Sequence, residues 1–143
     1  MNRKSLSLLL MLMLAAVSGL AQDAAKPIPA GSKVFINPMN DEYEKFLASA
    51  FKAKKVPVEI VTEKDKADFE ITGTTESKKA GAAKIIFRGS WRSSEQASIT
   101  VTNLKSGEAV WAYSVNKSDS AHGKKSTAEA CAKHLKEKIE KGK

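Results

Sequence analysis

The chain has few of the residues on which disulfide-stabilised folds and many active sites depend. Its 143 residues include one cysteine, Cys131, and two histidines, His122 and His134. A single cysteine excludes any disulfide within the chain. A zinc site needs about three or four ligands that converge, so we expect no metal, and we interpret Cys131 as a small core residue. We also expect no cofactor, and the fold must be held by a hydrophobic core.

The chain also lacks an apolar run of the roughly 20 residues that cross a bilayer. Its longest apolar stretch, residues 6–17, follows Arg3 and Lys4 and precedes small residues that end at Ala21. This is the pattern of a cleavable secretory signal peptide. We predict cleavage near Ala21, a periplasmic or secreted protein, and no transmembrane span in the mature form. Gln22 follows, where a bacterial lipoprotein would have cysteine.

Acidic residues are the scarcer charge, with 16 Asp and Glu against 24 Lys and Arg, for a formal net charge of +8. Loss of Arg3 and Lys4 with the signal peptide still leaves a basic protein. Such a charge favours anionic surroundings, such as envelope polymers. We do not expect nucleic acid as a partner, because an exported protein rarely meets it.

The mature chain is predicted to contain a linker, residues 22–32, and a single α+β domain, residues 33–141. Its periods indicate the order β-α-β-β-β-β-α, with two helices packed on one face of a mixed sheet. A further strand-like segment, residues 83–92, precedes a predicted hairpin loop at residues 92–95. The other predicted strands are residues 33–37, 56–61, 67–74, 96–104 and 109–116.

In two segments the apolar residues follow the spacing of an α-helix. The second is expected to begin at Ser126, which forms a capping box with Glu129, after an exposed loop at residues 116–125. Apolar residues follow one face of each helix. These stripes are Tyr43, Phe46, Leu47, Ala50 and Phe51 in the first helix, and Ala128, Cys131, Leu135 and Ile139 in the second.

Two strings resemble a group of bacterial envelope domains. They are K-A-D-F-E-I-T-G at residues 66–73 and L-K-S-G-E-A-V-W at residues 104–111. They are similar to a strand and a hairpin of the group that includes the periplasmic part of CsgG, LpoB and the N-terminal domain of TolB. The resemblance covers nearly all of residues 33–139 and implies an α+β envelope domain. Members of that group serve different tasks, so the resemblance implies no single function.

Four basic residues are the candidate anion-binding or partner-binding site. Lys124 and Lys125 precede the predicted helix, whose free amides could help to hold an anion. Arg88 and Arg92 lie on the strand-like segment that also contains Trp91. Together with these arginines and Trp91, Trp111 and Tyr113 could stack on sugars or bases. Their period of two instead favours an inner face of the sheet, directed toward the helices.

No catalytic residues are predicted, because the chain has neither a triad pattern nor a nucleophile elbow. We therefore predict an exported, non-enzymatic binding or accessory protein that engages an envelope protein or an anionic cell-wall polymer. The alternative is a small envelope hydrolase or transferase. A deep pocket with convergent carboxylates or histidines would favour that alternative.

Overall fold

The described part of the chain folds in the order predicted from its sequence periods. The computed structural model describes residues 27–78, 93–120 and 122–142. Two short 3-10 turns, Asn40–Glu42 and Lys64–Lys66, precede α1 and β3 respectively. The main elements are β1 (Ser32–Ile36), α1 (Tyr43–Lys54), β2 (Val58–Val61), β3 (Phe69–Lys78), β4 (Ser93–Asn103), β5 (Ala109–Ser120) and α3 (Gly123–Lys141).

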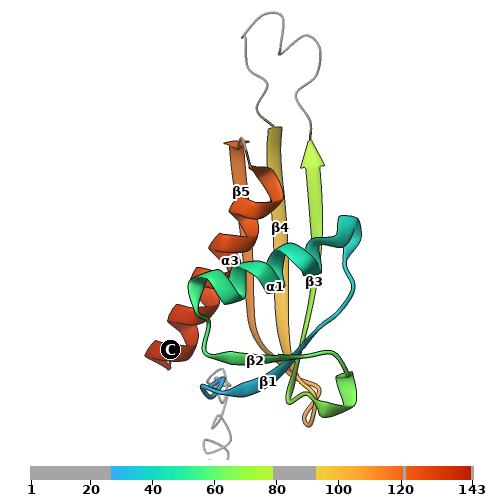
Figure 1. Cartoon of the computed structure of the whole chain (residues 1–143), viewed down its shortest axis with the longest axis vertical. Coiled ribbons are helices and arrows are strands. Elements are labelled where there is room, and N and C mark those ends of the chain that lie inside the picture. Colours follow the sequence, from blue (N-terminus) through green and yellow to red (C-terminus); the bar gives the residue numbers. More distant parts are fainter. Residues whose placement is uncertain (1–26, 79–92, 121, 143) are drawn as a thin grey trace, which may run out of the picture.

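The strands form one mixed sheet in the order β2-β1-β3-β4-β5. Strand β1 runs parallel to β2 and β3, whereas β3, β4 and β5 are antiparallel neighbours. The sheet twists so far that β1 and β2 lie across the direction of β4 and β5 (Figure 1). Because β5 is last in the strand order, it is an edge strand of the described sheet. The candidate site described below lies beside this strand.

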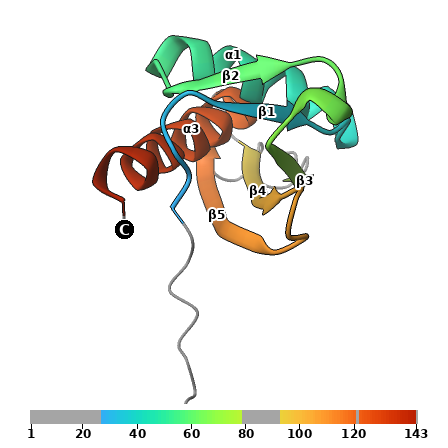
Figure 2. The same ribbon diagram turned by 90° about the horizontal axis from the view of Figure 1, so that it is seen from below.

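Both helices lie on the same side of the sheet, as predicted (Figures 1 and 2). Helix α3 packs on β4 and β5, and α1 packs on α3. The predicted core is confirmed for all but one residue, because Phe46 is 40% exposed. At 3.6 residues per turn, Phe46 lies at the rim of the α1 stripe. The residues of α1 that are buried are Tyr43, Leu47, Ala50 and Phe51.

The string at residues 66–73 has a structural role at several positions. Asp68 exchanges backbone and side-chain hydrogen bonds with Lys33, whose amide donates to Asp68 Oδ2 at 3.1 Å and whose carbonyl accepts from the Asp68 amide at 2.8 Å. Phe69 and Ile71 are buried in the core. A Cβ at Gly73 would lie 2.5 Å from the carbonyl oxygen of Ser98, so only glycine fits this close approach. The string therefore fixes β3 in the sheet.

The predicted loops beside the last two strands are wrong. Residues 93–95 lie in β4, and β5 continues to Ser120, since the backbone ladder between the two strands extends to the pair Ser93 and Ser120. Within the predicted loop at residues 116–125, residues 116–120 are therefore strand and residues 123–125 are helix. The predicted strand at residues 83–92 lies outside the described residues.

Helix α3 begins at Gly123, and the predicted cap at Ser126 is inside its first turn. Glu95 of β4 gives a physical reason. This side chain is 2% exposed, and a Cβ at Gly123 would lie 3.2 Å from Glu95 Oε2. A helix that starts at Gly123 brings its first turn against this side chain, and glycine permits the close approach.

Candidate functional site

Only two of the four basic residues of the predicted site are among the described residues. Arg88 and Arg92 lie outside the described residues. Lys124 and Lys125 are in the first turn of α3, where the amide of Ser126 already donates to the His122 carbonyl at 3.3 Å. That amide is therefore not free to hold an anion, as the prediction of a loop at residues 116–125 had required.

Lys124 is held against the turn that precedes α1. Its Nζ lies 3.2 Å from Asp41 Oδ2 and donates to the Asp41 carbonyl at 3.4 Å, and its side chain is 26% exposed. The aspartate offsets part of its charge. Lys124 thus ties α3 to the start of α1, and it offers less positive charge to a ligand than its sequence context indicated.

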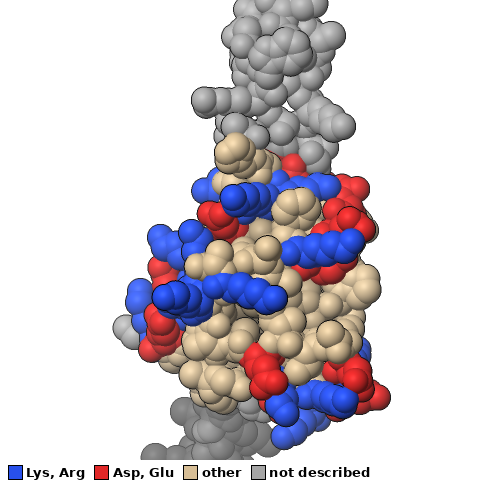
Figure 3. Space-filling view, viewed as in Figure 1, with Lys and Arg blue, Asp and Glu red and all other residues tan. Residues whose placement is uncertain are grey.

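Lys125 is exposed and borders a hollow of about 380 Å³ between α1 and α3. Glu129 also borders this hollow and pairs with Lys54 of α1 at 3.4 Å. The exposed Phe46 contributes an apolar wall. Figure 3 shows lysines and acidic residues interspersed over the face formed by α1 and α3, so no field of a single sign covers it.

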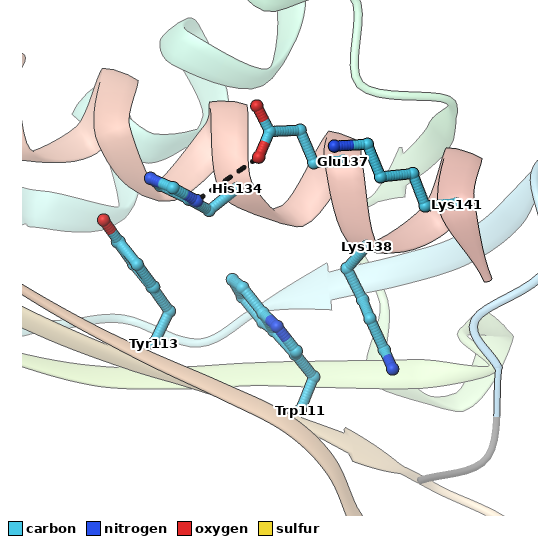
Figure 4. A pocket seen from close by; sticks show the side chains of 6 residues that line it. All are labelled: Trp111, Tyr113, His134, Glu137, Lys138 and Lys141. Carbon is cyan, nitrogen blue, oxygen red and sulfur yellow. Dashed lines mark ion pairs between the residues drawn. The ribbon is translucent and has the colours of Figure 1, made fainter. Parts of the chain in front are cut away.

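A second concavity, which we call the aromatic groove, lies between the edge strand β5 and the C-terminal half of α3. It has a volume of about 230 Å³. Trp111 and Tyr113 come from one face of β5, because strand side chains alternate with a period of two. The α3 residues follow the spacing i, i+3, i+4 and i+7 along one face of the helix. Figure 4 shows the six lining residues, which are Trp111, Tyr113, His134, Glu137, Lys138 and Lys141.

Three rings form a row along the groove. The Trp111 and Tyr113 planes are 4° apart with centroids at 5.8 Å, and Tyr113 and His134 are 26° apart with centroids at 4.4 Å. Such offset parallel arrangements are favourable for aromatic pairs. The Lys138 side chain runs beside Trp111 on the side away from Tyr113 (Figure 4). The row holds the indole in a fixed orientation, half-buried at the surface.

The polar groups of the groove differ in charge and function. His134 Nδ1 lies 3.5 Å from Glu137 Oε2, and both side chains remain partly exposed. Burial, followed by the nearby Cys131 and Glu137, raises the pKa of Tyr113 above its ordinary value, so its phenol remains a neutral donor. The groove therefore combines a carboxylate acceptor, a phenol donor and the ammonium groups of Lys138 and Lys141 around apolar ring faces.

Cys131 and His134 do not form a common site, although they are one helical turn apart. Cys131 is fully buried, and burial raises the pKa of its thiol to about 11. The hydroxyl of Tyr43 lies 3.9 Å from its sulfur. His134 instead stacks on Tyr113 in the groove. The interpretation of Cys131 as a core residue is confirmed, and within residues 27–78, 93–120 and 122–142 no cluster of ligands could hold a metal ion.

The sequence pattern predicts only part of the aromatic groove. Trp111 and Tyr113 are predicted on the inner face of the sheet, and both do pack against the core while remaining partly buried. The groove residues of α3 are not among the predicted site residues. The signal that could have found them is a helical face of His134, Glu137, Lys138 and Lys141 directly beside the apolar stripe.

Comparisons with known proteins show the fold alone. No family model and no curated protein matches the chain. The PelC dodecamer from Paraburkholderia phytofirmans and a singly substituted variant of it are similar, with 18% and 17% identity and TM-scores of 0.54 and 0.57 respectively. Each match covers 77% of this chain and 90% of PelC. TolB from Acinetobacter baumannii is similar at 9% identity and a TM-score of 0.48, over 82% of this chain and 29% of TolB. No helix in the described part of the chain is long and apolar enough to span a membrane.

Proposed function

We propose that this protein is an exported, non-enzymatic binding protein of the bacterial cell envelope, which engages an anionic cell-wall polymer. The aromatic groove carries the proposal, because it offers flat apolar rings beside groups of both charges on a face open to solvent. Export rests on the signal-peptide pattern of residues 1–21. An envelope protein is the other partner that these features support.

The chemistry of the groove favours binding over hydrolysis. Glycoside hydrolysis uses two carboxyl groups, about 5–9.5 Å apart, on either side of the scissile bond. Glu137 is the only carboxylate among the six residues that line the groove. A cysteine nucleophile needs its thiolate, and the raised pKa keeps Cys131 as a thiol. The hydrolase or transferase alternative therefore has less support here.

The basic residues predicted from the sequence remain part of the proposal. Lys124 and Lys125 lie at the start of α3, and Lys138 and Lys141 lie about 20 Å further along the helix axis, given a rise of about 1.5 Å per residue. One polymer chain can reach both ends of such a helix. We propose that Lys124, Lys125, Arg88 and Arg92 attract the polymer, while the aromatic groove contacts it directly.

Sedimentation with purified sacculi tests this function. Wild-type protein should pellet at about 50 mM salt and much less at about 500 mM, because salt screens attraction between exposed charges. Charge reversal at Lys124 and Lys125, or at Lys138 and Lys141, should each reduce the pelleted fraction. Reversal at Lys33 and Lys105 is the matched control, since these exposed lysines lie outside α3 and the change in net charge is equal.

Three results would contradict the proposal. They are no pelleting at low salt, pelleting that does not depend on salt, and equal loss in the control and test variants. Release of soluble sugar fragments during the incubation would support the hydrolase alternative instead. The mass of the protein in solution should be measured alongside, because the similar PelC chains are dodecamers.

A further inference from the structure

We infer that the aromatic groove binds a sugar residue that carries a carboxylate, as one unit of an anionic glycan. This inference rests on the proposed function and names the ligand class for the groove.

The aromatic side chains that line the groove offer apolar carbon to a sugar. A pyranose presents C–H groups on its faces and hydroxyls around its rim, so it can contact aromatic carbon while its rim remains hydrogen-bonded. Trp111 lies parallel to its neighbour Tyr113, and His134 stacks on Tyr113. The groove volume of about 230 Å³ is below the range of about 300–1,000 Å³ that is usual for drug-sized ligands. It therefore suits a single ring, with the rest of the glycan in solvent.

The lysines of the groove select an acid. Within the described residues, Lys136 on the neighbouring helix face pairs with Glu140 at 3.7 Å, whereas Lys138 and Lys141 form no ion pair. Two ammonium groups without a carboxylate partner border the same cavity as the rings. Hydrogen bonds between ammonium and carboxylate are about twice as strong as neutral ones. A carboxylated sugar offers these ammonium groups a carboxylate partner, and a neutral sugar does not.

Glu137 favours a sugar over nucleic acid. Aromatic rings with nearby lysines also stack on the bases of single-stranded nucleic acid. However, the Glu137 carboxylate lies 3.5 Å from His134 on the groove wall, where it can accept hydrogen bonds from ligand hydroxyls, and the backbone of a DNA strand offers none. Sugar hydroxyls provide such donors along the whole rim of the ring. The mixture of one acceptor and two ammonium groups therefore matches a hydroxyl-rich acid.

Calorimetric titration of the purified protein with four defined probes tests the inference. The carboxylated probes are trigalacturonate and the disaccharide of N-acetylglucosamine and N-acetylmuramic acid. Maltotriose is the neutral probe and hexathymidylate is the nucleic-acid probe. Both carboxylated sugars should bind at least about tenfold more tightly than maltotriose, which corresponds to about 1.4 kcal/mol. The order of the two acids distinguishes a uronic-acid glycan from peptidoglycan as the source.

Variants separate the contribution of each group. Trp111→Ala should weaken binding of the acids by about tenfold or more, and Trp111→Phe should restore affinity to within about threefold of wild type. Lys138→Gln with Lys141→Gln should weaken the acids by about tenfold and leave maltotriose unchanged. Lys33→Gln with Lys105→Gln is the matched control, since both lysines are exposed and outside α3, and it should leave all four affinities unchanged. Circular dichroism melting confirms that each variant is folded.

The inference is overturned if maltotriose binds as tightly as the acids, if hexathymidylate binds more tightly, or if folded Trp111→Ala retains wild-type affinity. Absence of saturable binding of either acid up to about 10 mM also overturns it. These results are distinct from failure of the proposed function. Sacculi that pellet the protein while both acidic sugars fail to bind would leave the proposed function standing and remove the groove as the sugar site. Failure of both assays would remove both.

Discussion

Replacement of Phe69 by alanine gives the most direct test of the register of β3. Phe69 is 4% exposed and lies between Val34 of β1 and Asn103 of β4. Loss of its buried ring removes about 1.5–3 kcal/mol of transfer free energy. The cavity left behind adds to this, so the free energy of unfolding should fall by about 3–5 kcal/mol. Thr72 is exposed on the opposite face of the same strand, and Thr72→Ala should change it by no more than about 0.5 kcal/mol.

Urea denaturation followed by circular dichroism measures both changes. The midpoint should fall for Phe69→Ala, and the slope against urea should be unchanged if the native and denatured states keep their compactness. A shift of one residue would move every side chain of β3 to the other face of the sheet. A nearly neutral Phe69→Ala, or a Thr72→Ala variant that is equally destabilised, would therefore refute the register.

Three further outcomes follow from the helices. Tyr43→Phe removes a buried hydroxyl that donates to Thr127 Oγ1 at 3.2 Å, so the free energy of unfolding should fall by about 0.5–1.5 kcal/mol in urea; an unchanged value would contradict this hydrogen bond. Phe46→Ser should lower the free energy of unfolding by about 1–2 kcal/mol, less than loss of a core residue does, because Phe46 is 40% exposed; a loss as large as that of a core residue would mean that α1 packs by another face. Burial raises the pKa of Cys131 from 9.0 to about 11, so above pH 9.0 the unfolded state loses this proton before the folded state does and stability falls. Between pH 8 and pH 10 this fall should be smaller in Cys131→Ala by about 1 kcal/mol, and an equal fall in both proteins would refute the shift.

The periods in the sequence predicted the middle of each described element better than its ends. The alternation around Phe69 and Ile71 and the stripe of Cys131 and Leu135 depend on burial, which is visible as apolar residues. The ends depend on backbone pairing, which needs no apolar residue. Strand β5 continues through polar residues to Ser120 because β4 supplies hydrogen-bonding partners across the ladder. A sequence pattern of hydrophobicity does not record that ladder.

The start of α3 illustrates a different limit. Ser126 followed by Glu129 is a correct capping pattern, but tertiary structure places the first turn at Gly123. The buried carboxylate of Glu95 beside that glycine comes from a strand some 28 positions earlier. The capping pattern at Ser126 therefore does not decide where α3 begins. The contact between Gly123 and Glu95 joins residues that are distant in the sequence, and no local pattern contains it.

The aromatic groove depends on where α3 crosses the sheet. Inward-facing side chains on a central strand are covered by the helices and become core, as Ile99 and Val101 of β4 are. Aromatic residues at such positions would be buried in the same way. Strand β5 is at the edge of the described sheet, so α3 covers Trp111 and Tyr113 only partly, and the helix face beside its stripe contributes charged groups in place of apolar ones. The sequence predicts an inner face for these aromatics but does not predict that this face lies at an edge. Their partial exposure is therefore a consequence of topology.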